Sequence, residues 1–138
     1  MPPVSLPILL EHLANGLVVG AYYTTLALGL SLIFGLGGVI NLAHGAFYAL
    51  GAYLAVEVQR QAGFGAALVL SPLLVALLGM GLEVLCLRRL YRRDPLLTLL
   101  LTFGLAMVGE QAIRIAWGTT GLPFQIPEGL RGFLALGD

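Results

Sequence analysis

Residues 35–45 read Gly-Leu-Gly-Gly-Val-Ile-Asn-Leu-Ala-His-Gly, and they interrupt an apolar stretch that is too long to be one membrane helix. Residues 13–56 contain no Asp, Glu, Lys or Arg, and a single helix of these 44 residues would be about 66 Å long. The hydrocarbon core of a bilayer is only about 30 Å thick. The chain must therefore turn back, and we expect the break at Gly35, Gly37 and Gly38.

The composition of the whole chain is that of a membrane protein. Of the 138 residues, 59% are hydrophobic and 10% are charged, whereas about 25% are charged in a typical soluble domain. Seven basic and seven acidic residues cannot cover a soluble surface, and the formal net charge is zero. This composition excludes a disordered tail, a nucleic-acid-binding protein and an ordinary cytosolic domain. It predicts an all-α integral membrane protein.

The chain divides into about four transmembrane segments, of which the second is short or broken. We expect these segments at residues 13–34, 39–56, 64–87 and 96–117. Residues 1–12 are predicted to form an N-terminal interfacial segment, residues 57–63 a polar loop and residues 118–138 an external tail.

The orientation follows from the arginines, because Lys is absent from the chain. Four of the seven basic residues lie in one short loop, at Arg88, Arg89, Arg92 and Arg93. Short cytoplasmic loops are enriched in basic residues, so this loop is predicted to be cytoplasmic. Residues 57–63 and 118–138 then face outside. The N-terminus lies outside if the second segment spans fully and inside if that segment is re-entrant, and the sequence leaves both open.

The glycine break is followed by polar residues that we predict to belong to a substrate pathway. Asn41, His44 and Tyr48 are three and four residues apart, so they share one face if the segment is helical, and Gly45 lies among them. Polar groups in an apolar helix face the bundle or a water-filled path. A helix that starts inside the membrane exposes free N–H groups, as in transporter substrate sites. The alternative is that Asn41 and His44 only hydrogen-bond a neighbouring helix.

Small residues at a spacing of four predict close helix packing. Gly16, Gly20 and Thr24 follow this spacing, as do Gly51 and Ala55. Such residues let helix backbones approach closely in a membrane.

Glu110 and Arg114 are four residues apart in the last predicted span. Side chains at this spacing meet on a helix, so we predict an intramembrane ion pair. The pair has either a structural role or a role in the pathway.

Sequence motifs for catalysis are absent. There is no GxxxxGK[ST] phosphate-binding loop, no HExxH and no cluster of His and carboxylates, and Cys86 is the single cysteine. No Ser, His and Asp stand in a triad arrangement. We therefore expect a protein that is not an enzyme and that holds neither a metal nor a cofactor.

Three stretches resemble one protein family. Residues 14–35 resemble its first span, residues 40–53 (INLAHGAFYALGAY) its signature second segment, and residues 90–106 the start of its fourth span. The third similarity continues through Glu110, Arg114, Trp117 and Gly118, and the whole resemblance covers residues 13–127. The family is that of the branched-chain amino acid ABC transporter permeases of the LivH type. Its Asn-Leu-Ala-His-Gly stretch is the most specific of these matches.

The resemblance implies a permease subunit in a bacterial inner (plasma) membrane, within a larger helical bundle. It implies a second permease subunit, two cytoplasmic ATPase subunits, a periplasmic binding protein and a branched-chain amino acid substrate, with lipid around the spans. A urea or short-chain amide permease of the same superfamily, and a non-transporting membrane scaffold derived from a permease, are the alternatives. Family permeases are considerably longer, so we expect this chain to correspond to an N-terminal half.

Overall fold

The chain is built only of helices in the part that the computed structural model describes, which is residues 5–90 and 93–124. In chain order the elements are α1 (Leu6–Gly37), α2 (His44–Ala62), α3 (Phe64–Leu85), the short 3-10 helix η1 (Leu87–Arg89) and α4 (Pro95–Trp117). The predicted all-α fold is confirmed.

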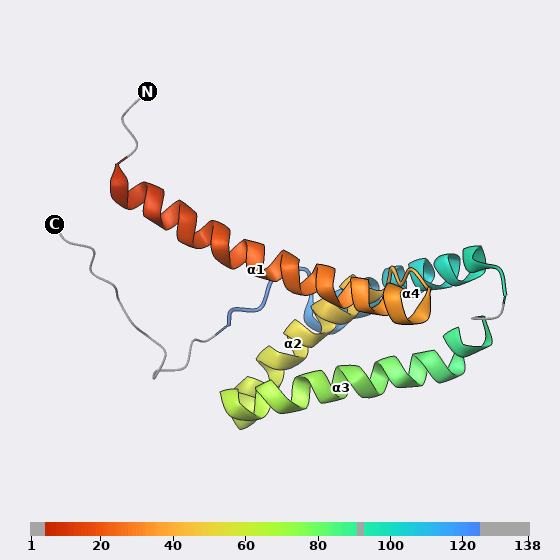
Figure 1. Cartoon of the computed structure of the whole chain (residues 1–138). Coiled ribbons are helices and arrows are strands. Elements are labelled where there is room, and N and C mark those ends of the chain that lie inside the picture. The colour runs from red at the N-terminus through yellow and green to blue at the C-terminus, as the bar shows by residue number, and fades with distance from the viewer. Residues whose placement is uncertain (1–4, 91–92, 125–138) are drawn as a thin grey trace.

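Helix α2 holds the other three long helices together. It packs closely against α3 and also contacts α4 and α1. The helices alternate in direction, so α1 begins, α2 ends and α3 begins toward one end of the molecule (Figure 1). The N-terminal half of α1 extends away from the other helices, and α1 buries none of its residues within the described chain.

Three of the helical segments are long and apolar enough to cross a membrane, which makes this a multi-pass membrane protein. They are Leu6–Gly37, Phe64–Arg89 and Pro95–Trp117. Within the described residues, α2 is not one of these candidates, because its C-terminal turns are polar. Most large apolar side chains on α1, α3 and α4 are exposed, as expected for surfaces that face lipid or further helices.

The predicted break between the first two segments lies at Gly38. This residue has φ 62°, which is the left-handed region that favours glycine, and its N–H donates to the Phe34 carbonyl at 2.8 Å. The chain then runs without a helix to Ala43, so the second segment is broken as expected.

Helix α2 begins in the interior of the bundle and not at its end. The ring of His44, the first residue of α2, lies against Gly29 of α1. Gly29 is eight residues before Gly37, or about 12 Å along the helix axis. The segment between the two helices therefore runs inward before α2 starts.

Part of the backbone of this inward segment is hydrogen-bonded although the segment is not helical. The Asn41 side-chain oxygen accepts from the Ala43 N–H at 3.0 Å, and the Asn41 carbonyl accepts from the His44 N–H at 3.3 Å. On α4, the Thr102 hydroxyl lies 3.4 Å from the Ile40 carbonyl and 3.0 Å from the carbonyl of Leu99. Polar backbone needs such partners inside a membrane protein.

The observed helix ends differ from the predicted ones in two places. Helix α1 begins at Leu6, so residues 6–12 are helical, and their interfacial position stays a prediction. Helix α2 continues to Ala62, so the polar loop predicted at 57–63 is wrong. Residues 57–62 contain no Gly or Pro, and the Gln61 amide donates to Glu57 one turn earlier at 2.8 Å. The polar composition of residues 57–62 indicated that they are exposed, but it did not indicate that they are non-helical.

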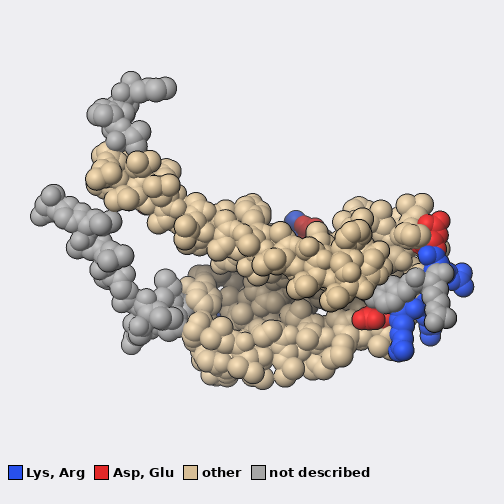
Figure 2. Space-filling view, in the orientation of Figure 1, with Lys and Arg blue, Asp and Glu red and all other residues tan. Residues whose placement is uncertain are grey.

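Charged side chains gather at the end of the molecule where α3 and α4 are joined (Figure 2). Arg88, Arg89 and Arg93 belong to this end, whereas Arg92 lies outside the described residues. Residues 118–124 contain no helix or strand, and residues 125–138 of the predicted external tail also lie outside the described part. The cytoplasmic position of the basic end stays a prediction.

The alternating helices predict the sidedness of the chain. In a Cys86→Ser background, we expect Ser5→Cys and Arg60→Cys to react with an impermeant thiol reagent from outside the cell. Arg89→Cys should react only from the cytoplasmic side, because basic ends stay inside. Labelling of Ser5→Cys and Arg60→Cys from opposite sides would contradict this arrangement.

Candidate functional site

A cleft of about 1200 Å³ lies between α1, α2 and α3. Figure 2 shows a hollowed surface between the upper and lower layers of the molecule. The lining is mainly apolar, and binding sites of this kind combine apolar walls with a few polar groups. The polar side chains that line it include Tyr22, Thr25, Asn41, His44, Tyr48 and Ser71.

The His44 ring occupies the space that Gly29 leaves by having no side chain. A Cβ atom on Gly29 would lie 2.7 Å from His44 Nε2 and 2.8 Å from His44 Cε1. These distances are shorter than van der Waals contact, so glycine is required at this position for the observed orientation of the ring. The contact also places the start of α2 directly against α1.

Ser71 on α3 offers an unused hydroxyl in the wall of the cleft. The residue is 3% exposed, and its Oγ atom has no hydrogen-bond partner in the part of the chain that the structure describes. A buried hydroxyl without a partner is unfavourable, so a polar group that enters the cleft gains by bonding it.

The cleft brings Asn41, His44 and Tyr48 together, but not in the way that the spacing predicted. Asn41 precedes α2 and is not on a helical face, because its side chain forms the turn that starts the helix. Gly45 lies on another side of α2 and lines a different cavity. Consecutive residues of a helix are about 100° apart, which separates Gly45 from His44.

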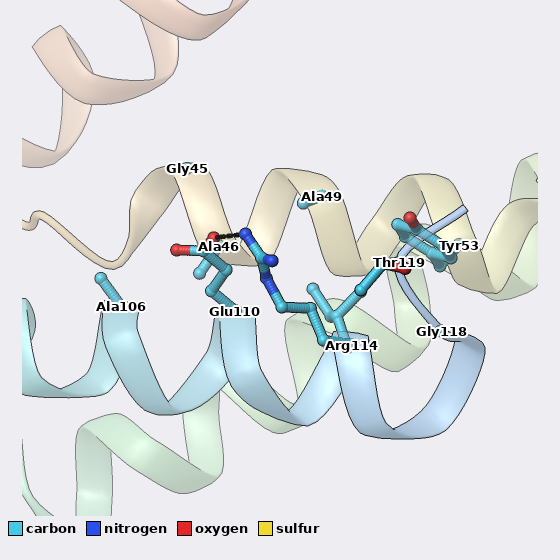
Figure 3. Close-up of a pocket in the computed structure, with 10 residues that line it drawn as sticks. Gly45, Ala46, Ala49, Tyr53, Ala106, Glu110, Arg114, Gly118 and Thr119 are labelled. Atoms are coloured by element: carbon cyan, nitrogen blue, oxygen red, sulfur yellow. Dashed lines mark hydrogen bonds and ion pairs between the residues drawn. The ribbon is translucent and has the colours of Figure 1, made fainter. Parts of the chain in front are cut away.

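This second cavity, of about 450 Å³, lies between α2 and α4. It contains Glu110 and Arg114, and Arg114 Nη2 donates to Glu110 Oε1 at 2.6 Å (Figure 3). A lone charge at the centre of a membrane costs roughly 2.5–3.5 kcal/mol on insertion scales, and pairing opposite charges reduces this cost. Both side chains are more than half exposed within this chain, at 53% for Arg114 and 64% for Glu110.

The predicted packing glycines fall into two groups. A Cβ on Gly51 would lie 3.5 Å from Val75, so Gly51 faces the α2–α3 contact. A Cβ on Gly16 or Gly20 would meet no atom within 4 Å, and the Thr24 hydroxyl donates to the Gly20 carbonyl of its own helix. The packing role of Gly16, Gly20 and Thr24 against a further helix stays a prediction.

Sequence reasoning missed several residues that position the site. Thr98 and Thr102 on α4 are 2% and 0% exposed, and Thr102 faces the broken segment. Their spacing of four in an apolar helix was a usable signal. Ser71 gave no comparable signal. Gly29 lies four residues after Thr25, which predicts close packing, but this spacing did not indicate His44 as the neighbour.

The fold is that of a multi-pass helical membrane protein with a broken segment beside a cleft. The chain belongs to the family described as "Branched-chain amino acid transport system / permease component", which matches residues 12–132.

Curated relatives match most of this chain but a smaller part of their own length. The chain is similar to the high-affinity branched-chain amino acid transport system permease protein BraD of Pseudomonas aeruginosa, with 29% identity over 78% of this chain and 38% of BraD. It is similar to LivH of Escherichia coli K12, with 23% identity over 80% of this chain and 39% of LivH. The match therefore spans about two fifths of these relatives. No solved structure matches the chain.

The contact between Gly29 and His44 predicts a specific coupling. We expect Gly29→Ala to lower the free energy of unfolding by about 1 kcal/mol, because the new methyl group displaces the ring. In a His44→Ala background the same change should have almost no effect. Gly16→Ala is the matched control, since a Cβ there meets nothing within 4 Å.

Thermal unfolding in detergent measures the four stabilities of this double-mutant cycle. An equal loss for Gly29→Ala in both backgrounds would show that the two residues are not coupled.

Proposed function

We propose that this chain forms part of the translocation pathway of a binding-protein-dependent ABC importer for branched-chain amino acids, in a bacterial inner membrane. Family membership supports the class, and the names of the relatives from Pseudomonas aeruginosa and Escherichia coli support the substrate. The observation that carries the proposal is the broken segment, which starts α2 inside the bundle and beside a cleft.

The cleft has the chemistry that such a substrate needs. The partial positive charge at the N-terminus of α2, near His44, attracts a carboxylate, although the N–H groups of Ala43 and His44 are themselves bonded to Asn41. The apolar walls from α1 and α3 suit a branched aliphatic side chain. Asn41, His44 and Tyr48 supply polar contacts along the path, and the unpaired Ser71 hydroxyl adds one on the opposite wall.

The proposed importer contains further subunits. A second permease subunit completes the pathway, two cytoplasmic ATPase subunits hydrolyse ATP, and a periplasmic binding protein delivers the substrate. This chain takes the role of a transport subunit without an ATPase site of its own. The basic end near Arg88 and Arg89 then faces the cytoplasm.

The mainly apolar lining of the cleft favours an amino acid with an aliphatic side chain over urea or a short amide. A neutral, strongly hydrated solute would gain little from such walls. The experiment uses cells that express the protein with its binding protein. Comparing their uptake of labelled leucine and of labelled urea distinguishes an amino acid permease from a urea or amide permease. Assembly without uptake of either solute would instead support a scaffold.

Two substitutions test the pathway directly. We expect Asn41→Ala and His44→Ala each to lower leucine uptake by about tenfold, because each removes a polar contact inside a site with little water. His12→Ala is the matched control, since His12 is exposed on α1 and bonds the Ile8 carbonyl of its own helix.

Uptake and substrate-stimulated ATP hydrolysis are the two readouts, at equal protein levels in the membrane. Wild-type values for both Asn41→Ala and His44→Ala would exclude these residues from the pathway.

A further inference from the structure

We propose that the cavity between α2 and α4 binds the head group of a zwitterionic amino acid, with Arg114 on the ligand carboxylate and Glu110 on the ligand ammonium. This inference rests on the proposed function for the class of ligand. Its location rests on a different part of the molecule, because the cleft described above lies on another side of α2.

Small residues create room for a ligand directly over the ion pair. Gly45, Ala46 and Ala49 of α2 line the cavity, and Figure 3 shows both charged side chains reaching from α4 toward them. A Cβ on Gly109 would lie 3.2 Å from the Ala46 Cβ, so the two helices pack tightly just beside Glu110. Larger side chains at these α2 positions would fill the space above the charges.

Within the described residues, the pair retains unused bonding capacity. One N–H of Arg114 meets one oxygen of Glu110, whereas a guanidinium carries five N–H donors and a carboxylate has two oxygens. Both side chains are more than half exposed within this chain, and both line the cavity.

The two opposite charges select a dipolar ligand. An anion alone would meet the repulsion of Glu110, and a cation alone would meet that of Arg114. An amino acid head group satisfies both, since its carboxylate and ammonium are separated by one carbon atom. In the larger cleft the carboxylate would meet the N-terminal end of α2 but no guanidinium, because the lining contains no arginine among the described residues.

The surroundings complete the site. Ala46, Ala49, Ala106 and Ile113 provide an apolar wall for a side chain. The rings of Tyr53 and Trp117 lie 5.4 Å apart and join α2 to α4 at the end of the cavity away from the basic loop. Glu110 is seven residues before Trp117, or about 10 Å along α4. The site therefore lies near the side from which a binding protein would deliver substrate.

Equilibrium binding to the assembled importer in nanodiscs, without the binding protein, tests the proposal. The probes are labelled leucine, isocaproate (which lacks the ammonium) and isoamylamine (which lacks the carboxylate). The variants are Glu110→Gln and Arg114→Gln. The matched controls are Glu11→Gln and Arg60→Gln, which neutralise exposed charges on α1 and α2.

We expect both site variants to weaken leucine binding by at least about tenfold, the usual scale for losing a charged hydrogen bond. The analogues should respond in a crossed pattern. Glu110→Gln leaves isocaproate binding equal or stronger, and Arg114→Gln leaves isoamylamine binding equal or stronger. A pair that only supports the fold would not produce this pattern, because its loss affects all ligands alike.

The proposal is overturned if both variants bind leucine as the wild type does, if all three probes weaken together, or if the wild type binds no leucine. Labelled acetamide serves as an additional uncharged probe, and its binding as strongly as leucine also overturns the proposal. Failure of the proposed function looks different, because the wild-type importer with its binding protein would then transport no branched-chain amino acid. If leucine uptake is normal but one of these overturning binding results is obtained, only the proposed α2–α4 site is rejected. The proposed function then stands.

Discussion

Backbone N–H and C=O groups inside a membrane protein need partners, and the segment between α1 and α2 meets part of this requirement without being helical. Gly38 closes α1 with a left-handed turn, Asn41 bonds the backbone of the next turn, and Thr102 approaches from α4. These contacts let the chain run inward before α2 begins. The depth in the bundle at which α2 begins determines which of its residues face α1 and α3 and which face α4. Both cavities therefore depend on a few hydrogen bonds in one short segment.

Much of the fold follows from composition and from glycine. The charge-free stretch forced a turn, and Gly38 has the positive φ that makes the turn possible. The start of α2 was not predictable, because Val39 and Ile40 are apolar residues that read alike in helical and extended conformations. The end of α2 was mistaken for a loop, since polar residues at 57–62 indicated solvent but said nothing of backbone conformation. The hydrogen bond from Gln61 to Glu57 shows the helix continuing there.

The candidate sites were predictable only in part, for a related reason. Local spacing correctly placed Glu110 beside Arg114, because both residues lie on one helix. It grouped Gly45 with His44, although the helix turns these neighbours to different sides. The contacts of Gly29 with His44 and of Gly109 with Ala46 join distant parts of the sequence. A single sequence carries no record of which helix packs against which, so these contacts required the structure.

The length of α1 ties the cleft to the bilayer itself. Its 32 residues extend about 48 Å, well beyond a hydrocarbon core of about 30 Å. Such hydrophobic mismatch is relieved by tilting the helix, by local thickening of the bilayer or by emergence into the headgroups. No described helix packs along the N-terminal half of α1, so within the described chain only the bilayer would constrain the tilt of that half. Because Gly29 lies on the same rigid rod, a change in lipid chain length would move the wall against which the His44 ring rests.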